Sequence, residues 1–134
     1  MNNKLSTIST EEEKNIRFKL NNKSLIIEID GTEINSWDDY WNAISKAFSF
    51  PKLPDYLKPD YHSYYDIMTD LSWLETDNIT LFIKRYDCFL KDNRSLKDDI
   101  IRDFNDYLLP FWDKEAEKTV VGGKRKSFCV FLVS

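Results

Sequence analysis

The chain has 134 residues, of which 42% are hydrophobic and 31% are charged. This length supports one domain with one core, and this balance is typical of a folded protein rather than a disordered one. The formal net charge of −4 argues against nucleic acid as a direct ligand and suits a basic partner, because opposite charges steer association.

The sequence gives no sign of export or membrane insertion. Its first residues, MNNKLSTISTEEEKNIRFKL, lack the apolar region of a secretory signal. No apolar run approaches the ~20 residues that span a bilayer, so we expect a cytoplasmic protein that contacts no membrane. Cys88 and Cys129 lie next to or within apolar runs, which predicts buried, reduced thiols.

The polar segment 1–22 admits two interpretations. Thr10 and Glu13 have the spacing of a capping box, which indicates a short helix. Ile16, Phe18 and Leu20 alternate with basic residues, which instead indicates a strand. The sequence therefore predicts an N-terminal extension over residues 1–22, formed as either a strand or a short helix, followed by one domain over residues 23–134.

The first predicted elements of this domain are a strand and a helix. Residues 25–29 are mostly β-branched, which is typical of a buried strand, and Asp30-Gly31 has turn chemistry. Ser36 and Asp39 have capping-box spacing and predict the start of a helix. Its core face has five residues at helical spacing: Trp37, Tyr40, Trp41, Ile44 and Phe48.

After a second helix over residues 61–71, the apolar run 79–86 predicts a central strand. Ser95 and Asp98 open a third helix, which Pro110 ends or kinks, and Phe111 and Trp112 pack on the core beyond it. The apolar stripe of this helix is Ile100, Ile101, Phe104, Tyr107 and Leu108. With a last strand over residues 127–133, the order predicts an α/β fold: a small three-stranded parallel sheet packed with helices.

Enzyme signatures are largely missing. His62 is the one histidine, no nucleophile-elbow motif accompanies it, and the three glycines form no phosphate-binding loop. We therefore expect no catalytic activity and no cofactor. Asp60 and His62 could both contact an ion, so a small enzyme or a ligand- or metal-binding protein that uses Asp60, His62 and Asp66 stays open as the alternative.

The second helix divides into two faces at 100° per residue. One side carries Tyr61, Tyr64, Tyr65, Met68 and Leu71, and the other carries His62, Ser63, Asp66, Thr69 and Asp70. The polar side is either an ordinary solvated face or a binding surface. Tyrosine is favoured in interfaces, and Pro54 and Pro59 restrict the preceding loop, which supports the second interpretation.

These residues resemble a known family. Pro54-Asp55-Tyr56-Leu57, followed nine residues later by Asp66-x-Met68-Thr69-Asp70-Leu71, is similar to the binding loop and helix of the barstar family. The turn at residues 29–34 and the apolar last strand also resemble that family. The likeness covers residues 25–134 and implies an intracellular inhibitor whose loop and helix plug the active site of a basic secreted ribonuclease or related nuclease toxin.

The resemblance also implies roles for individual residues. Tyr56 matches a loop tyrosine that contacts the enzyme. Asp66 matches a helix aspartate that occupies a phosphate-binding subsite, and Thr69 matches a nearby threonine that also contacts the enzyme. The expected partner-binding residues are Tyr56, Asp60, His62, Tyr65, Asp66, Thr69 and Asp70. His62 replaces an acidic residue of the family and Tyr65 a tryptophan. We expect a monomer; an interaction module for another basic partner is a further interpretation of the same surface.

Overall fold

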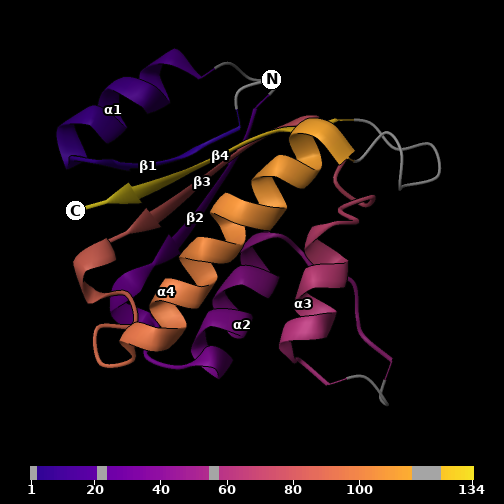
Figure 1. Ribbon diagram of the computed structural model, residues 1–134. Coiled ribbons are helices and arrows are strands. Elements are labelled where there is room, and N and C mark those ends of the chain that lie inside the picture. The colour runs from indigo at the N-terminus through magenta and orange to yellow at the C-terminus, as the bar shows by residue number, and fades with distance from the viewer. Residues whose placement is uncertain (1–2, 21–23, 55–57, 116–124) are drawn as a thin grey trace.

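The computed structural model describes residues 3–20, 24–54, 58–115 and 125–134. One parallel sheet, with the strand order β1-β4-β3-β2, is packed between helices (Figure 1). The strands are β1 (Leu5–Ile8), β2 (Leu25–Asp30), β3 (Asn78–Lys84) and β4 (Ser127–Val133). The α-helices are α1 (Thr10–Lys19), α2 (Trp37–Ala47), α3 (Tyr61–Met68) and α4 (Arg94–Asp103). Two 3₁₀ turns follow strands, at Gly31–Glu33 and Tyr86–Cys88.

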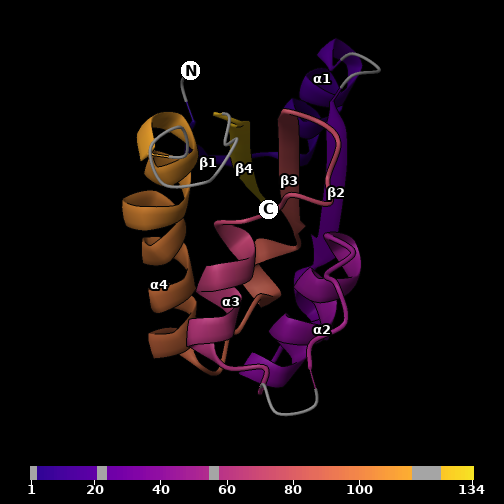
Figure 2. The ribbon, with the colours of Figure 1, turned by 90° about the vertical axis from the view of Figure 1, so that its right-hand side faces the viewer.

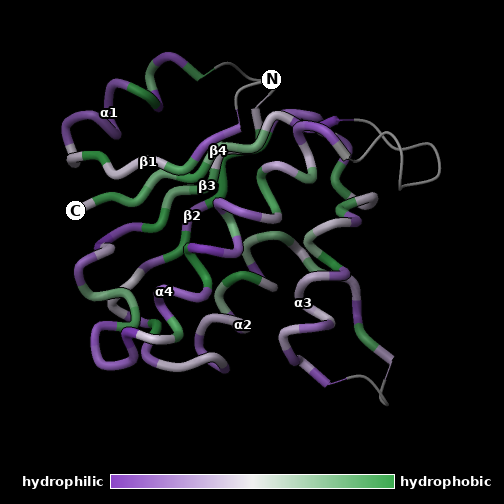
Figure 3. Tube along the Cα trace, viewed as in Figure 1, coloured by the Kyte–Doolittle hydropathy of each residue, from purple (hydrophilic) through white to green (hydrophobic). Residues whose placement is uncertain are grey.

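The helices lie on both sides of the sheet. Helices α2, α3 and α4 gather on one side, and α1 lies on the other (Figures 1 and 2). The hydrophobic strands run through the middle of the molecule, between more polar helices (Figure 3). Side chains alternate along β3: Leu81 packs in the large core beneath α2, α3 and α4, while Phe82 packs beneath α1. The predicted central position of this strand is confirmed.

The predicted α/β class is confirmed, but the count of three strands is wrong because the sheet has four. The missed strand is β1, which pairs in parallel with β4 from Leu5 opposite Val130 to Ile8 opposite Val133. Its sequence, LSTI, has four residues and only two large apolar side chains. Such a short pattern gives little periodicity, so the pairing depends on tertiary contacts rather than on local sequence.

The N-terminal segment also contains a helix, which decides between the two interpretations of residues 10–20. Its capping box is formed by Ser9 and Glu12, one position before the expected pair. The alternation of Ile16, Phe18 and Leu20 is incidental: Ile16 and Leu20 pack on the sheet, four residues apart, while Phe18 is 91% exposed.

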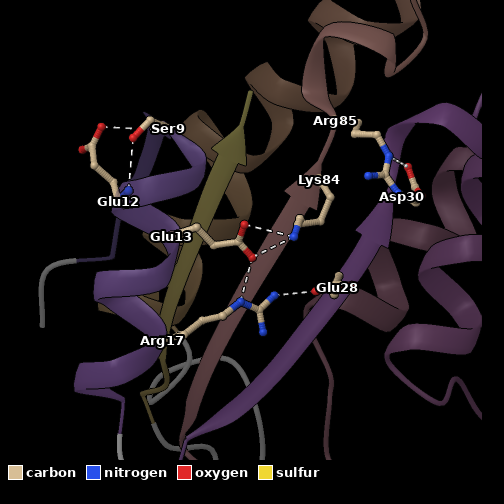
Figure 4. Close-up of polar contacts among 8 residues, drawn as sticks. All are labelled: Ser9, Glu12, Glu13, Arg17, Glu28, Asp30, Lys84 and Arg85. Atoms are coloured by element: carbon tan, nitrogen blue, oxygen red, sulfur yellow. Dashed lines mark hydrogen bonds and ion pairs between the residues drawn. The ribbon is translucent and has the colours of Figure 1, made fainter.

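An ionic cluster fastens α1 to the sheet (Figure 4). The carboxylate of Glu13 is buried and accepts hydrogen bonds from Arg17 Nε at 2.7 Å and Lys84 Nζ at 3.0 Å. Arg17 also pairs with Glu28 of β2. Burial raises the pKa of Glu13, but the bonds from Lys84 and Arg17 outweigh it, so the pKa lies below its usual value. Glu13 is therefore a charged contact between α1 and β3.

Helix α4 does not end at Pro110, as one interpretation allowed. Helical turns continue through it in the wider π form, at Phe104–Leu108 and Phe111–Glu115. The extra residue in a π turn changes which side chains face the core. Phe104 and Leu108 remain buried, but Tyr107, predicted in the core stripe, is 57% exposed. Trp112 is buried, as predicted.

Two smaller sequence predictions also need correction. Asn93, rather than Ser95, caps α4 by accepting the backbone N–H of Leu96 at 3.2 Å. Cys88 and Cys129 form no disulfide, but both are half-buried rather than buried because they lie at the margins of the core. Within the described ranges, no helix has the length and apolar character needed to cross a bilayer.

Candidate functional site

Helix α3 is defined at both ends by its own polar side chains. Asp60 is the N-cap and accepts the backbone N–H of Ser63 at 2.9 Å. This bond lowers the pKa of Asp60 below its usual value. At the other end, the Thr69 hydroxyl donates to the carbonyl of Tyr65 at 2.8 Å. The ends of this short helix are thus fixed without help from a partner.

The inner face of α3 is anchored to two other helices. The hydroxyl oxygens of Tyr64 and Tyr40 of α2 lie 2.7 Å apart in the core. Trp112, in the π turns after α4, donates its indole N–H to the carbonyl of Met68 at 2.9 Å. Just before α3, Trp37 of α2 donates to the carbonyl of Pro59 at 2.7 Å. These bonds tie α3 and the preceding Pro59 to α2 and to the π turns after α4.

The outer face of α3 is polar and open to solvent. The side chains of His62 and Asp66 are 87% and 65% exposed, and His62 Nε2 lies 3.5 Å from Asp66 Oδ2. Asp70 is exposed, and Tyr65 and Thr69 are half-buried beside this stripe. A carboxylate is therefore presented to solvent from a backbone that is already ordered, which lowers the entropic cost of binding.

The structure brings most of the predicted binding residues together on or beside α3. Those in described segments are Asp60, His62, Tyr65, Asp66, Thr69 and Asp70. Tyr56 lies outside the described residues. Ser63 was placed on the polar side but is only 8% exposed, whereas Tyr61, placed on the apolar side, is 40% exposed. The buried residues of α3 are Ser63, Tyr64, Ile67 and Met68.

Sequence reasoning missed one acidic residue near this surface. Asp103 of α4 is 4% exposed and interacts with the hydroxyl of Tyr61, the first residue of α3. Burial raises the pKa of Asp103, and the contact with Tyr61 offsets part of this effect. A signal was present, because Asp103 lies three residues after Ile100 and directly before Phe104, within the apolar arc of the helix.

The metal-binding alternative lacks geometric support. Among the described residues, no three histidine, cysteine or acidic side chains are close enough together to hold an ion. His62 and Asp66 lie side by side. The carboxylate of Asp60 instead accepts a hydrogen bond from the backbone N–H of Ser63, at the N-terminus of the helix. Two neighbouring groups on an exposed helix are a common ion pair rather than a metal site.

The comparison with protein families agrees with this arrangement. The sequence model of the barstar (barnase inhibitor) family matches residues 25–132. The chain belongs to the barstar family. No curated protein and no solved structure gives a significant match.

The region that matches the barstar family runs from β2 to nearly the end of β4 and includes all of α3. The family is described as inhibitors of barnase. Strand β1 and helix α1 precede the matched region. These two elements therefore lie outside the region that matches the barstar family.

Proposed function

We propose that this chain is an intracellular inhibitor of a ribonuclease or a related nuclease toxin, and that α3 with its preceding loop plugs the basic active site of that enzyme. The observation that carries the proposal is the exposed Asp66 carboxylate on an anchored helix within the barstar match. A carboxylate in this setting can take the place of a substrate phosphate, because both accept charge-assisted hydrogen bonds from arginine.

The surrounding residues fit an interface around Asp66. Tyr65 and Thr69 are half-buried neighbours that supply aromatic area and a hydroxyl, and Asp70 adds a second exposed carboxylate. Asp60 and His62 flank the start of the helix. We propose these six residues, together with Tyr56 of the preceding loop, as the contact set. The acidic net charge of −4 would favour rapid encounter with a basic enzyme.

The proposal is tested by adding the purified full chain to barnase and to the nuclease encoded nearest to its gene. Calorimetry would measure binding, and cleavage of an RNA substrate would measure inhibition. We expect one-to-one binding that abolishes cleavage by at least one of these enzymes. Binding without loss of cleavage would contradict the plugging mechanism, and the absence of binding to both would contradict the choice of partner.

A matched pair of variants separates the site from general charge effects. Asp66→Ala removes an exposed carboxylate from α3, and Glu11→Ala removes one from α1, on the other side of the sheet. Both change the net charge by the same amount. Loss of inhibition in the first variant alone would support α3 as the inhibitory surface, whereas equal effects would point to non-specific electrostatic attraction.

A further inference from the structure

A small pocket lies beside the start of α3 and is lined mainly by residues of α4. Figure 2 shows these two helices next to each other. Its lining residues are Tyr61, Asp99, Arg102, Asp103 and Tyr107, and its volume is ≈ 340 Å³. Tyr61 is the first residue of α3, so the pocket borders the surface that we propose for the ribonuclease. The other four residues come from α4 and its first π turn.

One carboxylate oxygen of Asp103, a residue that lines this pocket, has no hydrogen-bond partner. Asp103 is 4% exposed, and its Oδ2 atom is buried without a hydrogen-bond partner. It is the one such side-chain atom among the described residues. Buried polar atoms nearly always have partners, so an unpartnered carboxylate oxygen at a pocket indicates a missing donor.

The charges around the pocket identify the kind of donor. Arg102 pairs with Asp99 at 3.2 Å, and no basic side chain in the described part of the chain bonds to Asp103 Oδ2. Tyr61 and Tyr107 are 40% and 57% exposed, and their rings add aromatic surface beside the carboxylate. A buried carboxylate next to exposed rings is a suitable environment for an organic cation, because the rings attract positive charge through their π faces.

We propose that this pocket binds a guanidinium group, which donates N–H bonds to Asp103 and stacks against a rim tyrosine. A guanidinium is planar, forms two parallel bonds with a carboxylate and stacks on aromatic rings, whereas an ammonium has no plane to stack. Oδ2 is shielded from solvent, so a rim side chain must turn aside on binding. Tyr107 is the more exposed of the two tyrosines, whereas Tyr61 contacts Asp103 and packs against Trp37 and Tyr64.

The guanidinium could belong to an arginine side chain of the partner protein or to a free small molecule. If it belongs to the partner, the inference rests on the proposed function and adds a second contact next to Asp66. If it is free, the pocket is independent of inhibition. The first experiment therefore uses the chain alone, so that failure of the proposed function and failure of this inference can be distinguished.

The probe is ethylguanidinium, added to the full chain at constant ionic strength and followed by NMR. We expect saturable shifts at Tyr61, Asp103 and Tyr107, with affinity at least fivefold higher than for ethylammonium. Asp103→Asn should reduce the affinity at least tenfold. Asp106→Asn removes an exposed carboxylate from the same helix, outside the residues that line the pocket, and should change the affinity less than twofold.

Two outcomes would overturn the inference: undiminished binding by Asp103→Asn, or shifts that spread over exposed acidic residues without saturation. Thermal unfolding is measured for each variant, and Tyr107→Ala provides a second test on an exposed position, with a several-fold loss of affinity expected. Titration with the nuclease then identifies the source. A tenfold weaker complex for Asp103→Asn assigns the group to a partner arginine, and an unchanged complex assigns it to a free guanidinium.

Discussion

The hydroxyl oxygens of Tyr40 and Tyr64 lie 2.7 Å apart, fully enclosed between α2 and α3. Each hydroxyl is the other's partner, so replacing one tyrosine leaves a buried polar group alone. We expect Tyr40→Phe and Tyr64→Phe each to lower the free energy of unfolding by about 1–3 kcal/mol. The double variant should lose less than the sum, because no unpaired hydroxyl remains. Urea unfolding of the four proteins checks this, and additive losses would show that the hydroxyls do not interact.

Asp66 should matter for binding and not for folding. Its side chain is 65% exposed, and its Oδ2 lies 3.5 Å from Nε2 of His62. We expect Asp66→Ala to weaken the complex with the cognate ribonuclease by at least thirtyfold, which corresponds to a hot spot of about 2 kcal/mol. The free energy of unfolding should change by less than about 0.5 kcal/mol. Calorimetry and urea unfolding measure the two quantities, and an unchanged affinity would remove Asp66 from the interface.

His62 should make the complex sensitive to pH. When it is protonated, the imidazolium lies beside Asp66 and places a positive charge opposite a basic enzyme. We therefore expect affinity to fall several-fold as the pH is lowered from about 8 to about 5, the range in which histidine gains its charge, and His62→Gln to flatten this dependence. Affinity is measured by calorimetry between pH 5 and pH 8. The same pH dependence in parent and variant would assign the effect to the nuclease.

Asp30 should contribute to stability at neutral pH and less in acid. Its carboxylate accepts two bonds from Arg85, at 2.7 and 3.1 Å. The bonds from Arg85 lower the pKa of Asp30 from 3.8 to about 2. Because the folded-state pKa is the lower one, the stabilisation is complete above about pH 4 and is lost as the pH falls towards 2.

The matching variant is Asp30→Asn. Since the Arg85 side chain is 60% exposed, we expect a loss of no more than about 1 kcal/mol at pH 7. The difference between parent and variant should shrink between pH 4 and pH 2. Urea unfolding across this range measures it, and a difference that stays constant with pH would show that the pair with Arg85 is not its origin.

The sequence was most informative where apolar patterns are long. The continuous apolar run of β3 and the spacing of Tyr40, Ile44 and Phe48 along α2 and its C-cap are strong local signals, and these side chains are buried. The order of these elements predicted the parallel α/β fold. Strand β1 was missed because four residues carry too little pattern, and its pairing with β4 depends on residues far along the chain.

Part of the candidate site could also be predicted. The exposure of His62, Asp66 and Asp70 followed from helical spacing. The burial of Ser63 did not, because a small polar residue can face either side of a helix. The π turns around Pro110 could not be anticipated from an α-helical period. Tyr107 lies in the first of them and lines the same pocket as Asp103.

The parallel pairing of β1 with β4 also has a consequence for the time course of folding. Asn3, next to β1, accepts the backbone N–H of Phe128 across 125 positions of sequence. During synthesis on the ribosome, β1 is made first but has no neighbouring strand until β4 has emerged from the exit tunnel. We therefore expect β1 to pair later in folding than β2 and β3, because its partner strand lies far along the chain. Pulsed hydrogen exchange during refolding should show the amides of β1 protected after those of β2 and β3.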